Sequence, residues 1–216
     1  MPSTGSTREE VDARWQDAGS GEHYVHDRWR GQRARERDPR LIQRLLRAMP
    51  TDTGIESILD VPCGTGRLGG VLDAPLVVQS DISLSMLLNV PPAASHGNLL
   101  QSSATSLPFA SGSFDLVVCC RLLHHLRESS DRQAVLKEIV RVSRRYIIAS
   151  YWDAASYGAW RRRTSSPLRR RKRPDVRQAV SLEVLRAELD EAGARLVTRA
   201  HSFRFVSQQT FLLAEK

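Results

Sequence analysis

Long apolar runs are absent from this sequence. None approaches the roughly 18 residues that a membrane-spanning helix needs, and the start, MPSTGSTREE, lacks the apolar segment of a signal peptide. Cysteine is also scarce, with 3 in 216 residues. Cys119 and Cys120 are adjacent and Cys63 stands apart, a spacing that gives neither paired disulfides nor a zinc site. We therefore expect a cytoplasmic protein with free thiols and no bound metal.

The length and composition predict one domain with appendages. With 216 residues, of which 41% are hydrophobic and only 6% aromatic, the chain can bury one substantial core. The first twenty residues are small and polar, so we expect a disordered tail at 1–20 and a folded domain at 21–216. Within that domain we expect lid helices at 21–50, with Tyr24, Arg28 and Trp29 as lid residues, and a basic insert at 152–180.

The excess positive charge is confined to one segment. The chain has 32 Lys and Arg against 24 Asp and Glu, a net charge of +8. Residues 161–173, RRRTSSPLRRRKR, hold eight basic residues and no acidic one, so the remainder is neutral. Such a patch, from Arg161 to Arg173, suits RNA, an anionic membrane surface or another phosphate-bearing partner. It is equally compatible with an exposed loop that binds nothing.

The apolar pattern predicts alternating strands and helices. This alternation is typical of an α/β fold in which helices cover both faces of a parallel sheet. We expect strands in 56–61, 76–81, 113–120 and 144–151, and a closing pair of strands in 195–203 and 208–216. We expect a first helix that begins at an Asp38 cap, has Pro39 in its first turn and stops at Pro50. A short helix at 67–72 and a helical turn capped by Ser83 should follow. Two further helices are expected in 131–143 and in 181–192, and Gly193 should stop the last one.

The segment SILDVPCGTGRLGG, residues 57–70, predicts a nucleotide site. Glycines after a buried strand let the backbone turn sharply and approach a ligand closely, and the backbone N–H groups that follow can face a negative atom. Asp81 ends the next strand, where its carboxylate can accept hydrogen bonds from both hydroxyls of a ribose. Gly64, Gly66 and Gly69 also match the G-x-G-x-x-G pattern of an NAD site. At this point an NAD site and a site for another ribose-containing cofactor both remain open.

Three stretches together resemble the class I S-adenosylmethionine-dependent methyltransferases. ILDVPCGTGR resembles the family's acid-x-Gly-x-Gly-x-Gly motif, QSDIS resembles its second motif, and SSATSLPFASGSFDLVVCCRLLHHL resembles the block that carries LPF, SFD and LHHL. The resemblance is strong over about 20–150 and nearest to enzymes that methylate ubiquinone and menaquinone precursors. It implies a Rossmann-like, doubly wound, mostly parallel seven-stranded sheet with helices on both faces.

The resemblance also implies roles for individual residues. Asp60 orients the amino end of S-adenosylmethionine, the loop glycines line its methionine part, and Asp81 holds the ribose. Pro62 replaces the family's first glycine, and Ser103 stands where the family often has an aspartate for the adenine. The predicted cofactor-binding residues are Asp60, Pro62, Gly64, Gly66, Asp81, Ile82, Ser103, Ala104 and Cys120.

The sequence leaves the methyl acceptor and any catalytic base open. His124 and His125 can take a proton near neutral pH, although a sulfonium carbon is already activated and positioning alone supplies much of the acceleration. The expected acceptor is a small molecule such as a quinone or lipid precursor. RNA or protein methylation is an alternative, and an NAD-binding oxidoreductase is another.

Overall fold

The computed structural model describes residues 32–50, 54–164, 177–201 and 206–216. The predicted tail at 1–20, the predicted lid residues Tyr24, Arg28 and Trp29, and the arginine-rich segment from 165 to 173 lie outside the described residues. The statements below concern the described part of the chain.

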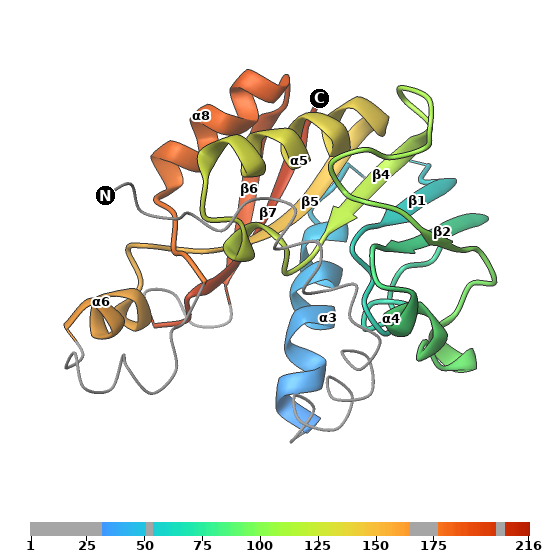
Figure 1. Cartoon of the computed structure of the whole chain (residues 1–216), viewed down its shortest axis with the longest axis horizontal. Helices are drawn as coiled ribbons and strands as arrows, with labels where there is room; N and C mark the ends of the chain where they lie inside the picture. The colour runs from blue at the N-terminus through green and yellow to red at the C-terminus, as the bar shows by residue number, and fades with distance from the viewer. Residues whose placement is uncertain (1–31, 51–53, 165–176, 202–205) are drawn as a thin grey trace, which may run out of the picture.

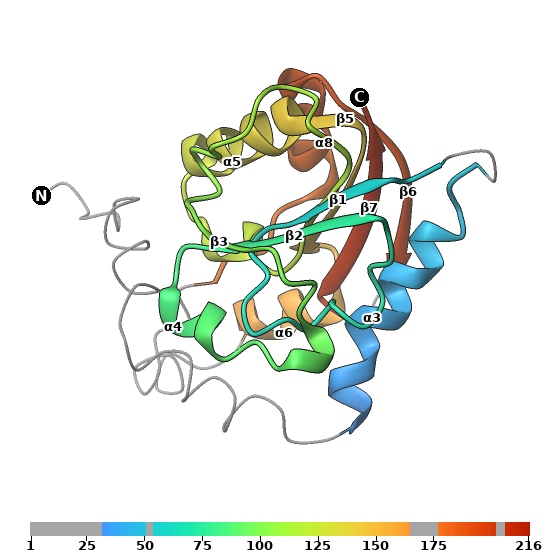
Figure 2. The same ribbon diagram turned by 90° about the vertical axis from the view of Figure 1, so that its right-hand side faces the viewer.

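A single seven-stranded sheet forms the centre of the molecule, in the order β3-β2-β1-β4-β5-β7-β6 (Figures 1 and 2). Neighbouring strands are parallel except that β7 runs antiparallel to both β5 and β6. This confirms the predicted mostly parallel sheet and its closing pair of strands. The strands are β1 (Ser57–Asp60), β2 (Leu76–Asp81), β3 (Leu99–Gln101), β4 (Phe114–Cys119), β5 (Ser143–Trp152), β6 (Arg195–His201) and β7 (Gln209–Glu215).

Helices cover both faces of the sheet, as predicted. Helices α5 and α8 lie together on one face, and α3 lies on the other (Figure 1). On the first face, the guanidinium of Arg132 in α5 forms two hydrogen bonds with the carboxylate of Glu188 in α8, and both side chains are buried. The helices are α3 (Gln32–Leu46), α4 (Leu84–Leu88), η1 (Pro92–Ala94), η2 (Leu123–His125), α5 (Ser129–Val142), α6 (Tyr157–Thr164) and α8 (Leu182–Ala192).

Local signals in the sequence explain where α4 and α8 begin and end. The hydroxyl of Ser83 accepts a hydrogen bond from the N–H of Met86, which confirms Ser83 as the cap of α4. Ser181 caps α8 in the same way through the N–H of Val184. Gly193 ends α8 in a left-handed conformation with φ of 90°, as its position predicted.

The prediction that Asp38 caps a helix was wrong. Helix α3 already includes Gln32, so Asp38 and Pro39 lie inside it. The helix nevertheless presents an apolar face to the sheet, where Leu41, Ile42 and Leu45 are buried. Asp38 stays on the same side of the helix, one turn before Ile42, and this periodicity buries its carboxylate as well.

The short helix predicted at 67–72 was also wrong. Residues 64–71 form consecutive turns, and Gly69 lies so close to the next segment that a Cβ there would come within 1.9 Å of the carbonyl oxygen of Ala94. Strand β3 was missed altogether, since three residues of mixed exposure carry no recognisable period. Both segments take their shape from contacts that are distant in the sequence.

Candidate functional site

A pocket opens at the carboxyl ends of β1, β2 and β4, where parallel sheets of this kind bind ligands. Its wall includes the segment after β1, the start of α4, the loop after β3 and the segment after β4. All predicted cofactor-binding residues except Gly66 line this pocket. Segments that are up to about sixty residues apart in the sequence therefore meet around one space.

Asp60 is the most unusual polar residue in the pocket wall. Its side chain is completely buried at the end of β1, and no described residue donates a hydrogen bond to either of its carboxylate oxygens. Burial and the nearby Asp81 carboxylate raise the pKa of Asp60 well above its ordinary value of 3.8. A buried carboxylate without a donor is costly, so this site favours a ligand that brings a positive charge or N–H groups.

Asp81 is held in a fixed orientation at the end of β2. One of its oxygens accepts a hydrogen bond from the N–H of Gly64 at 2.8 Å, and the other accepts one from the N–H of Ser83 at 2.9 Å. Burial raises its pKa, while these backbone donors act in the opposite direction. Each carboxylate oxygen has two lone pairs, so Asp81 can still accept hydrogen bonds from a ligand.

The two glycines of the loop, Gly64 and Gly66, have different structural roles. Gly64 adopts φ of 56° where the chain leaves β1, and its N–H holds Asp81. Gly66 adopts φ of 76°, and a Cβ there would come within 2.8 Å of a Val90 methyl carbon. Gly66 thus packs against the segment after α4 and is not among the residues that line the pocket, and its contact with a cofactor stays a prediction. Pro62 does line the pocket, and the bond between Val61 and Pro62 is cis.

The wall beyond Asp81 combines apolar side chains with hydroxyl groups. Ile82 and Met86 line the pocket from the start of α4, and Ala104 lines it from the loop after β3. The hydroxyl of Ser103 lies 2.8 Å from that of Thr105, so it is already engaged within its own loop. Met86 and Thr105 also line the pocket but were not identified from the sequence: Met86 belongs to no recognisable motif, and Thr105 lies in the block that carries LPF but was not assigned a contact there.

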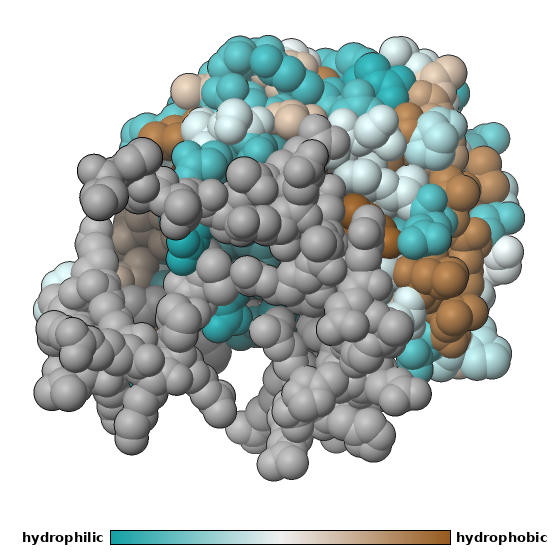
Figure 3. All heavy atoms as spheres, in the orientation of Figure 1, coloured by the Kyte–Doolittle hydropathy of each residue, from teal (hydrophilic) through white to brown (hydrophobic). Residues whose placement is uncertain are grey.

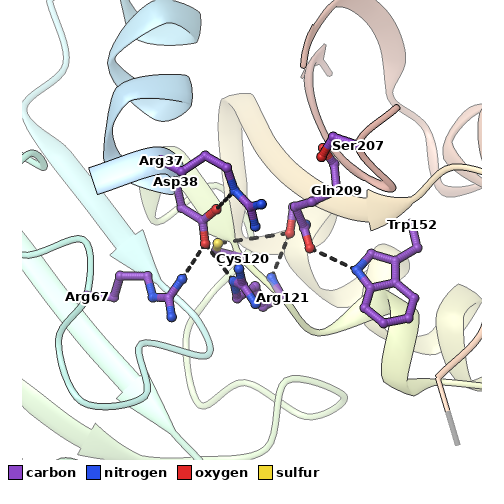
Figure 4. A network of polar contacts seen from close by, with 9 residues as sticks. Arg37, Asp38, Arg67, Cys120, Arg121, Trp152, Ser207 and Gln209 are labelled. Carbon is purple, nitrogen blue, oxygen red and sulfur yellow. Dashed lines mark hydrogen bonds and ion pairs between the residues drawn. The ribbon is translucent and has the colours of Figure 1, made fainter. Parts of the chain in front are cut away.

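A buried ion-pair cluster joins α3 to the pocket wall (Figure 4). Both Arg67, from the glycine loop, and Arg121, from the segment after β4, donate to the same oxygen of Asp38, at 2.5 and 2.6 Å. Arg37 donates to the other oxygen at 3.4 Å. Burial alone would raise the pKa of Asp38, but the Arg121, Arg67 and Arg37 guanidiniums lower it below its ordinary value. Asp38 is therefore an ionised carboxylate that fixes two arginines of the pocket wall.

Arg121 and Cys120 follow β4 at the centre of the pocket. Arg121 has φ of 65°, the left-handed region that non-glycine residues seldom adopt. Its N–H donates to the hydroxyl of Ser150 at 2.7 Å, which together with the Asp38 contact holds this conformation. Burial and the Asp38 carboxylate raise the pKa of Cys120 to about 12, so its side chain is a neutral thiol near pH 7.

The two candidate catalytic histidines lie in different surroundings. His124 is buried, and its ring stacks on Trp152 with 4.6 Å between the centroids. His125 is only partly buried and lines the pocket. Only His125 of this pair is therefore placed where it can meet a ligand.

The comparisons with known proteins agree with this geometry. Residues 59–146 match a family model described as a methyltransferase domain. A protein of Encephalitozoon cuniculi named "Putative methyltransferase ECU09_1500" is 39% identical over 85 residues, which are 39% of this chain and 39% of that protein. The chain thus matches about two fifths of the length of this curated relative.

Solved methyltransferases have the same fold. Magnesium protoporphyrin IX methyltransferase from Synechocystis, with bound S-adenosylhomocysteine, superposes with a TM-score of 0.71 at 20% identity, over 95% of this chain and 99% of that one. A possible histamine N-methyltransferase from Thermotoga maritima gives 0.62 at 16% identity, over 90% and 97% of the two chains. The protein therefore has the Rossmann-like fold of the class I S-adenosylmethionine-dependent methyltransferases. The residues that match the methyltransferase domain model, 59–146, form the middle part of the chain.

No described helix is both long and apolar enough to span a membrane. Among the residues that the structure describes, no three His, Cys, Asp or Glu side chains group together so that they could hold a metal ion.

Proposed function

We propose that this methyltransferase domain transfers a methyl group from S-adenosylmethionine to a small organic acceptor. The observation that carries the proposal is the buried Asp60 carboxylate, which lines the pocket and receives no hydrogen bond from a described residue. The ammonium group of a methionine moiety supplies both the charge and the N–H donors that Asp60 needs. The pocket residues therefore fit this cofactor.

The remaining polar groups fit the other parts of the same molecule. Asp81 accepts hydrogen bonds from the two ribose hydroxyls through the lone pairs that Gly64 and Ser83 leave open. Ile82 and Met86 pack on the adenine, and the Ser103–Ala104 segment meets its polar edge. When bound, the cofactor supplies an activated methyl group. The protein supplies its orientation toward the acceptor and the exclusion of water.

The acceptor side of the pocket supports a largely apolar substrate. Leu122, Leu126 and Val135 line it alongside Cys120 and Arg121. One of the structurally similar enzymes is named for magnesium protoporphyrin IX and the other for histamine, and both of these compounds are small molecules. We propose an acceptor of the quinone-precursor or lipid type, with an apolar body and one polar group that receives the methyl.

His125 is the candidate for proton removal from the acceptor. It lines the pocket, and a neutral imidazole can accept the proton of a hydroxyl or amine as the methyl group transfers. Replacing it with Gln should lower kcat and remove the lower limb of the pH profile, with little change in cofactor affinity. His201→Gln is the matched control, because His201 lies in β6 and its side chain does not line the pocket.

Ligand binding tests the proposed cofactor directly. Because a ligand that binds only the folded state raises the melting temperature, S-adenosylmethionine and S-adenosylhomocysteine should each stabilise the protein. NAD, the ligand of the alternative oxidoreductase function, should not. Calorimetry with all three compounds gives the affinities, and a response to NAD without a response to S-adenosylhomocysteine would reject the proposal.

Radiolabelled methyl donor then identifies the acceptor class. Incubation of the protein with labelled S-adenosylmethionine and cell extract, followed by separate extraction of small molecules, lipid, RNA and protein, shows where the label goes. Label in the small-molecule or lipid fraction is the expected result. Label in RNA or protein would instead support the alternative, in which the basic residues from Arg161 to Arg173 contact a macromolecule.

A further inference from the structure

A long segment without charge forms one side of the molecule. In a chain with 26% charged residues, residues 82–114 contain no Asp, Glu, Lys or Arg, the longest such stretch in the sequence. Its only titratable side chain is His96, which lies 2.8 Å from the carbonyl oxygen of Gly69 and is therefore engaged within the domain. The segment includes α4, η1 and β3.

Much of this segment is exposed although it is apolar. Leu84 and Leu88 are four residues apart on α4 and are 51% and 77% exposed, and Leu99 in β3 is 41% exposed. Pro91 and Pro92 between them are exposed as well. Hydrophobic residues gather along this side of the molecule in Figure 3, on the side that carries α4 and β2 in Figure 1. Apolar area of this kind, without charge, is typical of the centre of a protein interface.

The same side carries an open edge of the sheet. Strand β3 is the last strand in the order, and among the described strands it pairs only with β2. Backbone bonds to β2 use the carbonyl of Asn98 and the N–H of Ser102. Because alternate residues face opposite sides along a strand, the N–H and C=O groups of Leu99 and Gln101 point away from β2. They can pair with a strand from outside.

The opposite edge strand, β6, differs from β3 in its charge and in the regularity of its pairing. Strand β6 carries Arg195 and Arg199, and its register with β7 shifts between Leu196 and Thr198. Charges and irregular pairing are two of the features by which proteins prevent strand addition at an edge. Strand β3 has neither protection, so the two edges are not equivalent.

We infer that a second copy of this chain docks on the α4–β3 face, with β3 pairing antiparallel to β3 of the copy about a twofold axis through Leu100. In this register Leu99 faces Gln101 of the copy, so the outward N–H and C=O groups of these residues form four hydrogen bonds in two pairs. The exposed leucines of both copies then cover one another. A chain of net charge +8 repels its own copy on average, and this uncharged face avoids that repulsion.

The lack of basic residues also decides against other occupants. A nucleic acid requires Lys or Arg contacts to its phosphates, and an anionic membrane surface requires the same. Residues 82–114 contain no Lys or Arg, so they offer such contacts to neither partner. The inference concerns association of the folded chain and is independent of the proposed methyl transfer.

Sedimentation of the purified full chain over a concentration series tests the docking. The parent protein should be a dimer at micromolar concentration, and Leu88→Glu should weaken self-association at least about tenfold, because it places like charges on both copies of the face. Val197→Glu is the matched control, since Val197 is an exposed apolar residue, 47% exposed, on the opposite edge strand β6. It should leave the dimer unchanged.

A cross-link tests the register. An antiparallel non-hydrogen-bonded pair has a Cα separation of about 4.5 Å, within the range that a disulfide spans. Leu100→Cys should therefore form a covalent dimer when oxidised glutathione takes up the two thiol electrons, whereas Val197→Cys should stay monomeric. The native cysteines are all buried and do not compete.

Three outcomes would overturn the inference. The first is a parent protein that stays monomeric at every concentration. The second is a dimer that Leu88→Glu leaves intact. The third is a dimer that Val197→Glu disrupts as strongly as Leu88→Glu does. Circular dichroism of each variant checks that it folds, and if Leu88→Glu fails to fold, the Leu100→Cys cross-link alone decides.

Discussion

Asp38 and Asp60 are both completely buried carboxylates, yet they have opposite surroundings. Asp38, in α3, accepts hydrogen bonds from three guanidiniums, and its pKa lies below the ordinary value. Asp60, at the end of β1, has no described donor, and its pKa lies well above the ordinary value. Burial is the same, so the partners decide the charge state. The difference separates a carboxylate with three cationic partners from one that has no donor among the described residues.

Removal of the Asp38 charge should have the largest effect on stability. In Asp38→Asn, Arg67 and Arg121 lose their shared carboxylate while they remain largely buried, and breaking a buried ion pair on one side costs about 3 kcal/mol. Urea denaturation should show this loss. Glu36→Gln is the control on the same helix, because its pair with Arg40 is exposed and contributes little. Equal stability of the two variants would contradict the role given to Asp38.

The corresponding change at Asp60 should separate stability from binding. Asp60→Asn removes a carboxyl that ionises more readily in the unfolded chain than in its buried site, so the free energy of unfolding without ligand should rise by about 1 kcal/mol at neutral pH. Affinity for S-adenosylhomocysteine should fall about tenfold or more, because a charge-assisted hydrogen bond is lost. Denaturation and calorimetry measure the two effects, with the exposed Asp73→Asn as control. A variant that is less stable and still binds normally would remove Asp60 from the site.

The pH dependence of binding should follow from the raised pKa of Asp60. In the folded protein without ligand, the carboxyl holds its proton to a higher pH than in the unfolded chain, where the pKa is near 3.8. Its contribution to stability is therefore present at low pH and declines as the pH rises from 3.8 through the raised pKa. The ammonium ligand requires the ionised form, so affinity for S-adenosylhomocysteine should decline by at most about tenfold per pH unit below that pKa.

Calorimetry at several pH values checks this dependence. Binding within that range should also release a proton, which calorimetry in buffers of different ionisation enthalpy detects. Asp60→Asn should show a smaller pH dependence than the parent, and the remainder reports on Asp81, whose pKa burial also raises. An identical pH dependence in parent and variant would assign the effect elsewhere.

An exposed ion pair provides the smallest expected effect. Lys137 in α5 and Glu191 in α8 lie 3.1 Å apart, with both side chains about half exposed, close to the buried Arg132–Glu188 pair that joins the same helices. Lys137→Met should change the free energy of unfolding by less than about 1 kcal/mol, because solvent screens the pair. Thermal unfolding measures it. A loss as large as that of Asp38→Asn would show that burial is not what distinguishes these charges.

Much of the site could be predicted because its signals are local. The glycine loop follows directly after β1, Asp81 ends β2 and Ser83 caps α4, so each position depends on residues a few places away in the sequence. The Asp38 cluster carried no such signal. Asp38 precedes Arg67 by 29 residues and Arg121 by 83. Only the packing of α3 against the sheet brings the three together. Asp38 is not a cap because α3 begins before it, at Gln32.

The sequence by itself determined the order of the strands other than β3 and of helices α3, α4, α5 and α8, since apolar periods, caps and turn residues act over a few positions. It also placed Asp60 and Asp81 at the ends of parallel strands, which always meet at one edge. Only the tertiary structure decided which of the buried carboxylates is paired, because the distance between a charge and its partner depends on how distant segments pack. That distance, and the exclusion of water around it, made Asp38 an anion with partners and left Asp60 without a donor among the described residues.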